Sequence, residues 1–129
     1  MAYNILVVDD SETVRAVIAK TLDLSGVSLG KVYQAANGVE ALALLGREWI
    51  DLVFCDINMP EMNGVELIDR IRQDETLKDL PIVVISTEGS KTRIEDLKNK
   101  GVRAYIHKPF TPELLRNVVE NLLGGKNGS

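Results

Sequence analysis

The sequence has only one cysteine, Cys55, among its 129 residues, so no disulfide can form within the chain. It has no apolar run near the roughly 20 residues that a membrane-spanning helix needs. The first residues, 1–5, lack the basic segment and the cleavage site of a secretory signal. These absences favour a protein that works in the cytoplasm.

An excess of positive charge is also lacking, with 15 Lys and Arg against 19 Asp and Glu and a net charge of −4. Nucleic acids and anionic membranes attract clustered basic residues, so we expect neither as a partner. Internal repeats and low-complexity segments are absent too. The length suits a single domain, which we place at residues 1–124, and the glycine-rich residues 125–129 are expected to form a flexible tail.

The sequence does contain five short apolar runs that alternate with stretches of helical periodicity. The runs predict strands at residues 5–8, 32–36, 52–55, 82–85 and 104–106. The periodic stretches predict helices from about 11 to 22, at 38–45, around 65–71, near 92–100 and from 112 to 123. The fourth helix has only Ile94 and Leu97 as large apolar anchors, so we expect it to be weakly held and able to move.

Five strand–helix units predict an α/β fold, in which helices cover both faces of a parallel sheet. The first, third and fourth strands are the most continuously apolar and should be central. The more polar second strand and the short fifth strand should be the edges. This gives the order 2-1-3-4-5, and ligands bind such sheets at the carboxyl ends of the strands, beside the reversal between strands one and three.

Polar side chains follow four of these strands directly. Asp9 and Asp10 follow the first, Asp56 the third, Ser86 the fourth and Lys108 the fifth. Because the carboxyl ends of parallel strands meet at one edge of the sheet, we expect these side chains to converge. Each has an ordinary explanation when taken alone, such as a helix cap or a solvated charge, but their joint placement favours a functional site.

The converging residues suit phosphoryl chemistry on a carboxylate. Crowded carboxylates repel one another, and Mg²⁺ relieves this repulsion because it prefers oxygen ligands and can also bind phosphate oxygens. Asp56, neutralised in this way, can act as a nucleophile toward phosphorus. The ion, Lys108 and the Ser86 hydroxyl would then stabilise the oxygens of the arriving phosphoryl group.

The motifs that carry these residues resemble the receiver domain of bacterial response regulators. They are the run at residues 7–11, the run at residues 56–64, Ser86 and the run at residues 108–110. The resemblance extends from about residue 4 to residue 123 and is greatest to the single-domain chemotaxis type, which is CheY-like. It implies a flavodoxin-like fold of five βα units, with the strand order already expected.

The resemblance also assigns roles to individual residues. It implies that Asp56 is the phosphoacceptor and that Asp10 binds Mg²⁺ directly, with Asp9 acting mainly through water. Asp56 and the backbone carbonyl of Asn58 would complete the protein ligands. Lys108 would pair with the phosphoryl group, and its bond to Pro109 is expected to be cis, which X–Pro bonds permit.

Further roles concern the response to phosphorylation. The resemblance makes Ser86 and Tyr105 a switch pair, in which the hydroxyl moves toward the phosphate and the ring turns inward behind it. Asn58 and Glu88 match the chemotaxis type, in which they flank the path of the attacking water and favour rapid loss of the phosphate. Thr87 is bulkier than the Ala or Gly that is common there, and we expect it to slow the entry of small phosphodonors.

The function expected is that of a phosphoacceptor in two-component or chemotaxis signalling, phosphorylated by a histidine kinase. Its output partner would bind the face formed by the fourth helix, the fifth strand and the fifth helix. The chain should be a monomer and catalyse only its own phosphorylation and dephosphorylation. The alternatives are a receiver module of a larger regulator and an Mg²⁺-dependent phosphohydrolase with an aspartate nucleophile.

Three other residues are open to a functional interpretation that we consider weaker. Cys55 is expected to be a small core residue and not a reactive thiol. His107, the only histidine, is expected to be structural and not part of a phosphorelay. Trp49 is expected to pack at the end of the second helix.

Overall fold

The computed structural model describes residues 2–57, 63–87 and 90–124. Its strands are β1 (Tyr3–Val8), β2 (Leu29–Ala35), β3 (Leu52–Cys55), β4 (Ile82–Ser86) and β5 (Ala104–His107). Its helices are α1 (Glu12–Leu24), α2 (Gly38–Leu45), α3 (Gly64–Gln73), α4 (Lys91–Asn99) and α5 (Pro112–Val119), and α5 is followed by a π-helical turn, Glu120–Gly124.

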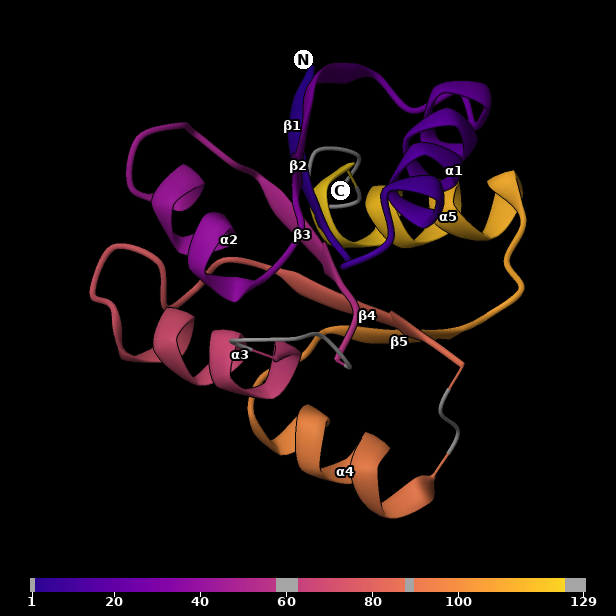
Figure 1. Cartoon of the computed structure of the whole chain (residues 1–129). Helices are drawn as coiled ribbons and strands as arrows, with labels where there is room; N and C mark the ends of the chain where they lie inside the picture. Colours follow the sequence, from indigo (N-terminus) through magenta and orange to yellow (C-terminus); the bar gives the residue numbers. More distant parts are fainter. Residues whose placement is uncertain (1, 58–62, 88–89, 125–129) are drawn as a thin grey trace.

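The strands form one parallel sheet in the order β2-β1-β3-β4-β5, as the sequence predicted. Helices α1 and α5 cover one face of the sheet, and α2, α3 and α4 cover the other (Figure 1). The reversal of strand order between β1 and β3 leaves a gap between the connections above them, where parallel sheets bind ligands.

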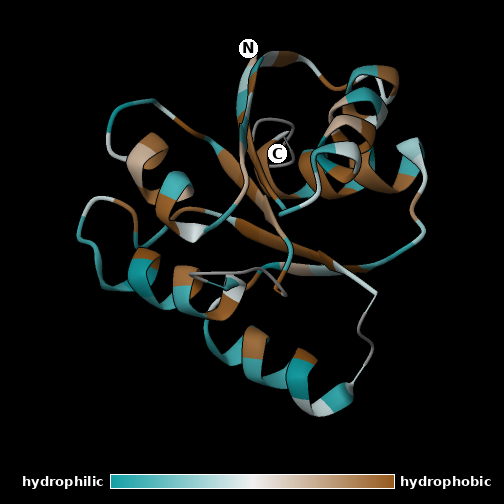
Figure 2. Cartoon of the chain, viewed as in Figure 1, coloured by the Kyte–Doolittle hydropathy of each residue, from teal (hydrophilic) through white to brown (hydrophobic). Residues whose placement is uncertain are grey.

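The central strands are buried on both faces, which explains their continuous apolar sequence. In β3, Val53 and Cys55 pack toward α2, α3 and α4, whereas Leu52 and Phe54 pack toward α1 and α5. Figure 2 shows hydrophobic residues along the central strands and a mixture of hydrophobic and hydrophilic residues along α3 and α4. The sheet is thus a fixed platform that separates two apolar cores.

Side-chain caps set where the helices begin. The Ser11 hydroxyl accepts a hydrogen bond from the backbone N–H of Val14 and so starts α1. At the start of α5, Thr111 does the same for Leu114, and Pro112 takes the first helical position. These caps fix the entry into each helix from the edge of the sheet that carries the polar residues.

The helix α4 is weakly anchored, as its sequence predicted. Leu97 is the only buried residue of α4, and Ile94 is partly exposed. The apolar face of α5 is narrower than the sequence suggested, because Leu114 is 39% exposed while Leu115 and Val119 are buried. Within the described ranges, no helix combines the length and apolarity that crossing a membrane requires.

The prediction that Trp49 packs against the fold is wrong. Its side chain is 76% exposed, and its indole N–H donates a hydrogen bond to Asp51 Oδ1 at 2.9 Å. The Asn4 side chain also donates to the Trp49 carbonyl, which fixes the backbone of the loop before β3. These bonds hold the ring on the surface. The strand β2 also differs, since it begins at Leu29 and not at residue 32.

Candidate functional site

Asp9 and Asp10 follow β1, and Asp56 follows β3, so the two central strands deliver three carboxylates to one edge of the sheet. The backbone continues the strand pattern there. The N–H of Asp9 donates to the Ala35 carbonyl at 3.1 Å, and the N–H of Asp56 donates to the Val8 carbonyl at 2.9 Å. The sheet itself therefore fixes the backbone positions of Asp9 and Asp56.

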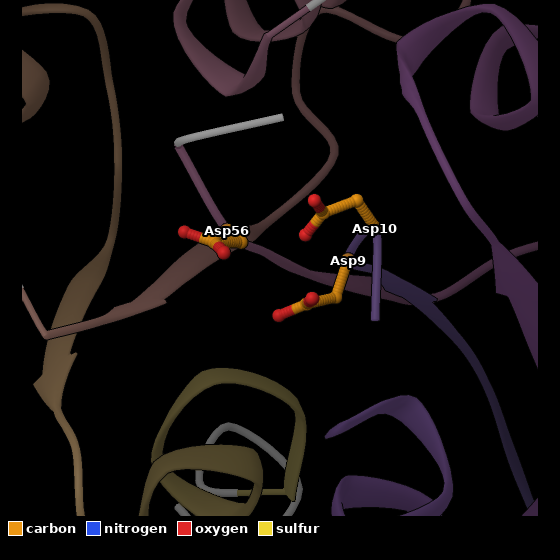
Figure 3. Close-up of side chains that lie close together, drawn as sticks. All are labelled: Asp9, Asp10 and Asp56. Carbon is orange, nitrogen blue, oxygen red and sulfur yellow. The ribbon is translucent and has the colours of Figure 1, made fainter. Parts of the chain in front are cut away.

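The three carboxylates lie close together, and one oxygen from each lies within 4.8 Å of the others (Figure 3). Asp9 is buried, Asp56 is partly buried and Asp10 is exposed. Three carboxylate oxygens around an opening to solvent suit a hard divalent cation that keeps part of its water shell. The convergence that the sequence predicted for these three residues is therefore present.

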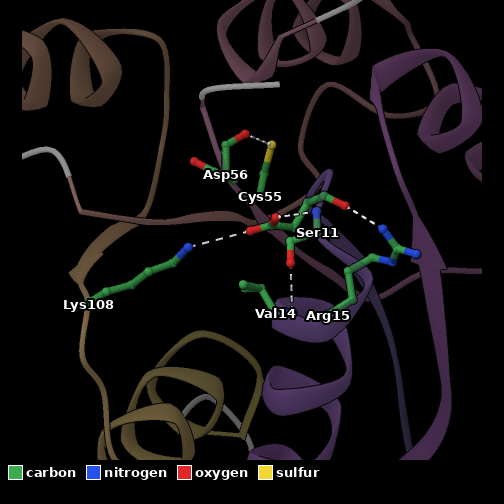
Figure 4. Close-up of polar contacts among 7 residues, drawn as sticks. Ser11, Val14, Arg15, Cys55, Asp56 and Lys108 are labelled. Atoms are coloured by element: carbon green, nitrogen blue, oxygen red, sulfur yellow. Dashed lines mark hydrogen bonds and ion pairs between the residues drawn. The ribbon is translucent and has the colours of Figure 1, made fainter. Parts of the chain in front are cut away.

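Asp9 is held by contacts with three residues that Figure 4 labels, namely Ser11, Arg15 and Lys108. Its Oδ1 accepts a hydrogen bond from the Ser11 N–H at 2.9 Å, and its carbonyl accepts one from Arg15 Nη1 at 2.7 Å. Its Oδ2 lies 3.5 Å from the Lys108 ammonium. That oxygen is buried and accepts no hydrogen bond from the described residues. It can therefore accept a hydrogen bond from the water shell of a bound cation.

Lys108 reaches this cluster from the end of β5. Its backbone N–H donates to the Ser86 carbonyl at 2.9 Å, which extends the β4–β5 pairing by one residue. The Lys108–Pro109 peptide bond is cis, as the resemblance implied. The lysine side chain is mostly buried and bears a positive charge toward the carboxylates.

Ser86 and Tyr105 lie on the neighbouring strands β4 and β5. Ser86 is the last residue of β4 and is 1% exposed. Tyr105 pairs in register with Val84 and packs, partly buried, against the core under α2, α3 and α4. Thr87 is exposed at the rim directly after Ser86, and His107 is exposed at the end of β5. Asn58 and Glu88 lie outside the described residues.

Two residues at the site had no assigned role in the sequence analysis. A Cβ on Gly64 would lie 2.6 Å from the Ile57 Cα, so glycine allows α3 to begin against the loop after β3. Its place directly after the capping residue Asn63 was the available signal. Arg15 holds the Asp9 carbonyl, but a single arginine on a helix gives no such signal.

Cys55 is buried in the core, as predicted. Its Sγ lies 3.1 Å from the Asp56 carbonyl, to which the thiol donates. Burial raises the pKa of the Cys55 thiol far above its usual value, and the charges of Asp56 and Asp9 add to this effect. The residue next to the acid cluster is therefore a neutral thiol.

The sequence and the fold are similar to those of known proteins. Residues 5–120 match the family model described as the response regulator receiver domain. The sequence is 42% identical over 126 residues to a chemotaxis protein CheY homolog of Campylobacter jejuni, which covers 97% of this chain and 95% of that protein. It is also 42% identical over 122 residues to chemotaxis protein CheY1 of Helicobacter pylori, which covers 94% of this chain and 97% of that one.

Solved structures give the same result. The structure of chemotaxis protein CheY4 of Vibrio cholerae matches with a TM-score of 0.85 at 33% identity and covers 95% of this chain and 100% of that one. The phosphorylated cyanobacterial phytochrome response regulator RcpA matches with a TM-score of 0.83 at 28% identity and covers 97% and 96%. In both cases the similarity includes nearly the whole of each chain.

Proposed function

The chain belongs to the receiver domain family of response regulators, and on that premise we propose that it accepts a phosphoryl group on Asp56 from a histidine kinase. The observation that carries the proposal is the convergence of Asp9, Asp10 and Asp56 within 4.8 Å, with the Lys108 ammonium 3.5 Å from Asp9. A carboxylate with its charge balanced in this way can attack phosphorus. The product is a mixed anhydride on Asp56.

Each residue of the cluster has a separate task in the transfer. An oxygen of Asp56 forms the new bond to phosphorus as the bond to the donor imidazole breaks, and the imidazole takes up a proton. Lys108 and the Ser86 hydroxyl stabilise the oxygens of the transferred group. Arg15 and the Ser11 N–H keep Asp9 in position at the buried end of the cluster.

The donor set fits Mg²⁺. Asp10, Asp56 and the backbone carbonyl of Asn58 would hold the ion directly, and Asp9 would hold it through water. When bound, the ion supplies positive charge that lowers the repulsion among the carboxylates and attracts the phosphoryl oxygens. The buried Oδ2 of Asp9 supports this assignment, since it accepts no hydrogen bond from the described part of the chain.

The signal would leave through the face formed by α4, β5 and α5, where the output partner binds. Ser86 and Tyr105 act as the switch pair, and their places on β4 and β5 link the acid cluster to that face. The weak anchoring of α4 supports a change in its position at low cost in free energy. Asn58, Glu88 and Thr87 would set how fast the phosphate is lost.

The pathway we propose is chemotaxis, because the relatives in Campylobacter jejuni and Helicobacter pylori are named as chemotaxis proteins. The chain would act in the cytoplasm as a monomer, bind neither nucleic acid nor membranes, and catalyse only its own phosphorylation and dephosphorylation. The alternatives are a receiver module within a larger regulator and an aspartate-based phosphohydrolase. Turnover of small phosphate esters would distinguish the phosphohydrolase from the receiver.

Labelling with acetyl phosphate in the presence of Mg²⁺ tests the proposal. The Asp56→Asn variant should take up no label on a phosphate-affinity gel or by intact-protein mass spectrometry. Asp23→Asn, which removes an exposed carboxylate from α1, should label like the unchanged protein. Labelling of Asp56→Asn at the unchanged rate would show that another residue is the acceptor.

A further inference from the structure

A concave surface lies at the rim of the sheet opposite the acid cluster. It has a volume of about 480 Å³ and is formed mainly by the loops before β3 and before β4. The backbone of these two loops lies at the left of Figure 1. The chain from Asp51 at this rim to Asp56 at the other spans about 16 Å at the rise of a strand. The volume is within the range of pockets that bind organic groups.

The lining combines an apolar floor with an acidic border. Its apolar members come from three separate parts of the chain, namely Leu45, Ile50, Leu77, Leu80, Leu122 and Leu123. Among the described residues that line the pocket, the charged side chains are the acids Glu48, Asp51 and Asp79 and the cation Arg103, and just outside the lining Arg47 Nε lies 3.8 Å from Glu48. The pocket therefore favours an apolar group that has positive charges beside it.

Trp49 stands at the border of this pocket with 76% of its surface exposed. Two hydrogen bonds hold it there, from its indole N–H to Asp51 and from the Asn4 side chain to its carbonyl. A large aromatic ring that is exposed but already ordered loses little entropy on binding, which is typical of residues that dominate interface energies.

The part of the pocket that comes from the loop before β4 is also held in place without a ligand. The guanidinium of Arg72 donates to the carbonyls of Lys78 at 2.7 Å and Leu80 at 2.9 Å, in the loop before β4. It donates as well to the carbonyls of Lys100 and Gly101, in the loop before β5. Four bonds from one side chain tie these two loops together, so the pocket does not have to be built when a ligand arrives.

We propose that this pocket docks a segment of a partner protein in which an apolar side chain is flanked by lysine or arginine. The apolar side chain enters the pocket beside Trp49. The basic residues pair with Asp79 and, in competition with Arg47 and the Tyr33 hydroxyl, with Glu48. Because β3 and β4 are rigid central strands between the two rims, docking here is independent of phosphorylation. A partner would therefore stay bound at this surface whether or not Asp56 is phosphorylated.

Two synthetic peptides of the same length test the proposal. Each has a central Leu-Phe pair, flanked on both sides by two lysines in one peptide and by two glutamates in the other. Trp49 is the only tryptophan in the chain, so its emission reports on this surface alone. The lysine peptide should shift the emission to the blue in a saturable way and bind about tenfold or more tightly than the glutamate peptide.

Variants locate the binding. With a fluorescein-labelled lysine peptide, fluorescence anisotropy should show weaker binding to Trp49→Ala and to Asp79→Asn. Leu24→Ala, which removes a 66% exposed apolar side chain from α1, should bind as the unchanged protein does. Asp56→Asn and beryllofluoride should leave the affinity unchanged, so the result is separate from that of the phosphoacceptor test.

Three outcomes overturn the proposal. One is the absence of saturable binding by the lysine peptide, and another is equal binding by the two peptides. The third is a concentration-dependent dimer in light scattering that buries Trp49 without any peptide, since a second copy of the chain would then be the occupant.

Discussion

The ammonium of Lys108 lies 3.5 Å from the buried Oδ2 of Asp9, so the lysine proposed to meet the phosphoryl group is already paired within the acid cluster. The pair joins the end of β1 to the end of β5 across the carboxyl edge of the sheet. On the proposed mechanism, Lys108 would turn part of its attraction from the Asp9 carboxylate to a phosphoryl oxygen on Asp56. This partial exchange is the change that phosphorylation would make at Lys108.

This exchange gives a prediction for Lys108→Ala. Mg²⁺ affinity, measured by calorimetry, should be retained, because all three carboxylates remain and a competing cation is removed. The chemical-shift changes that beryllofluoride causes in α4 and β5 should become much smaller, because the group that senses the phosphoryl oxygens is missing. Loss of Mg²⁺ binding with a normal beryllofluoride response would contradict the role given to Lys108.

Gly64→Ala should destabilise the fold. The new Cβ would lie 2.6 Å from the Ile57 Cα, a backbone atom that cannot move aside freely. Overpacking of this kind typically costs about 1–3 kcal/mol, to be measured by urea unfolding. Gly46→Ala is the matched control, since its Cβ would lie 3.5 Å from the Leu42 carbonyl, an ordinary contact. Equal losses in the free energy of unfolding for the two variants would show that the loop after β3 moves to accommodate the new Cβ.

Arg72→Met should destabilise the protein because it removes four hydrogen bonds to the backbone carbonyls of two loops. Two of these bonds are partly buried and two are exposed, and the loss of a charged donor from partly buried carbonyls costs about 1.5–3 kcal/mol in the free energy of unfolding. Arg70→Met, an exposed change on the same helix, should have little effect. If the two variants unfold at the same urea concentration, the four bonds make no net contribution to the free energy of unfolding.

Cys55 should resist alkylation in the folded protein at pH 8. Its pKa is raised by burial first and by the charges of Asp56 and Asp9 second, so the thiolate that reacts is almost absent. Iodoacetamide labelling, followed by mass spectrometry, should be slow in buffer and rapid in denaturant. Labelling in buffer at the rate of a free thiol would show that the strand end opens.

The order of the sheet and the meeting of Asp9, Asp10 and Asp56 could be predicted because both follow from the polarity of whole strands. Continuous apolar runs identified the central strands, and parallel strands bring their carboxyl ends together. The same reasoning placed Cys55 in the core. These predictions depend on the hydrophobicity of several residues taken together, so no single side-chain contact changes their outcome.

The exposure of Trp49 could not be predicted, because it depends on hydrogen bonds to two other residues. Asn4, 45 residues away in sequence, holds its carbonyl, and Asp51 holds its indole. The pairing of Lys108 with Asp9 likewise depends on the direction in which one side chain leaves β5. Periodicity and composition predict elements and faces, but they do not specify such individual bonds.

The burial of β3 and β4 on both faces restricts the positions at which a substitution can change the protein's contacts without changing its stability. Every residue of these strands except Ser86 fills one of the two apolar cores, so a substitution at those positions alters stability before it alters any contact with another molecule. Substitutions that alter contacts at little cost in stability are therefore expected in the connecting loops and on the outer surfaces of the helices. The two strands hold the two rims of the sheet at a fixed separation. The loops at one rim can therefore change in sequence without changing the loops at the other.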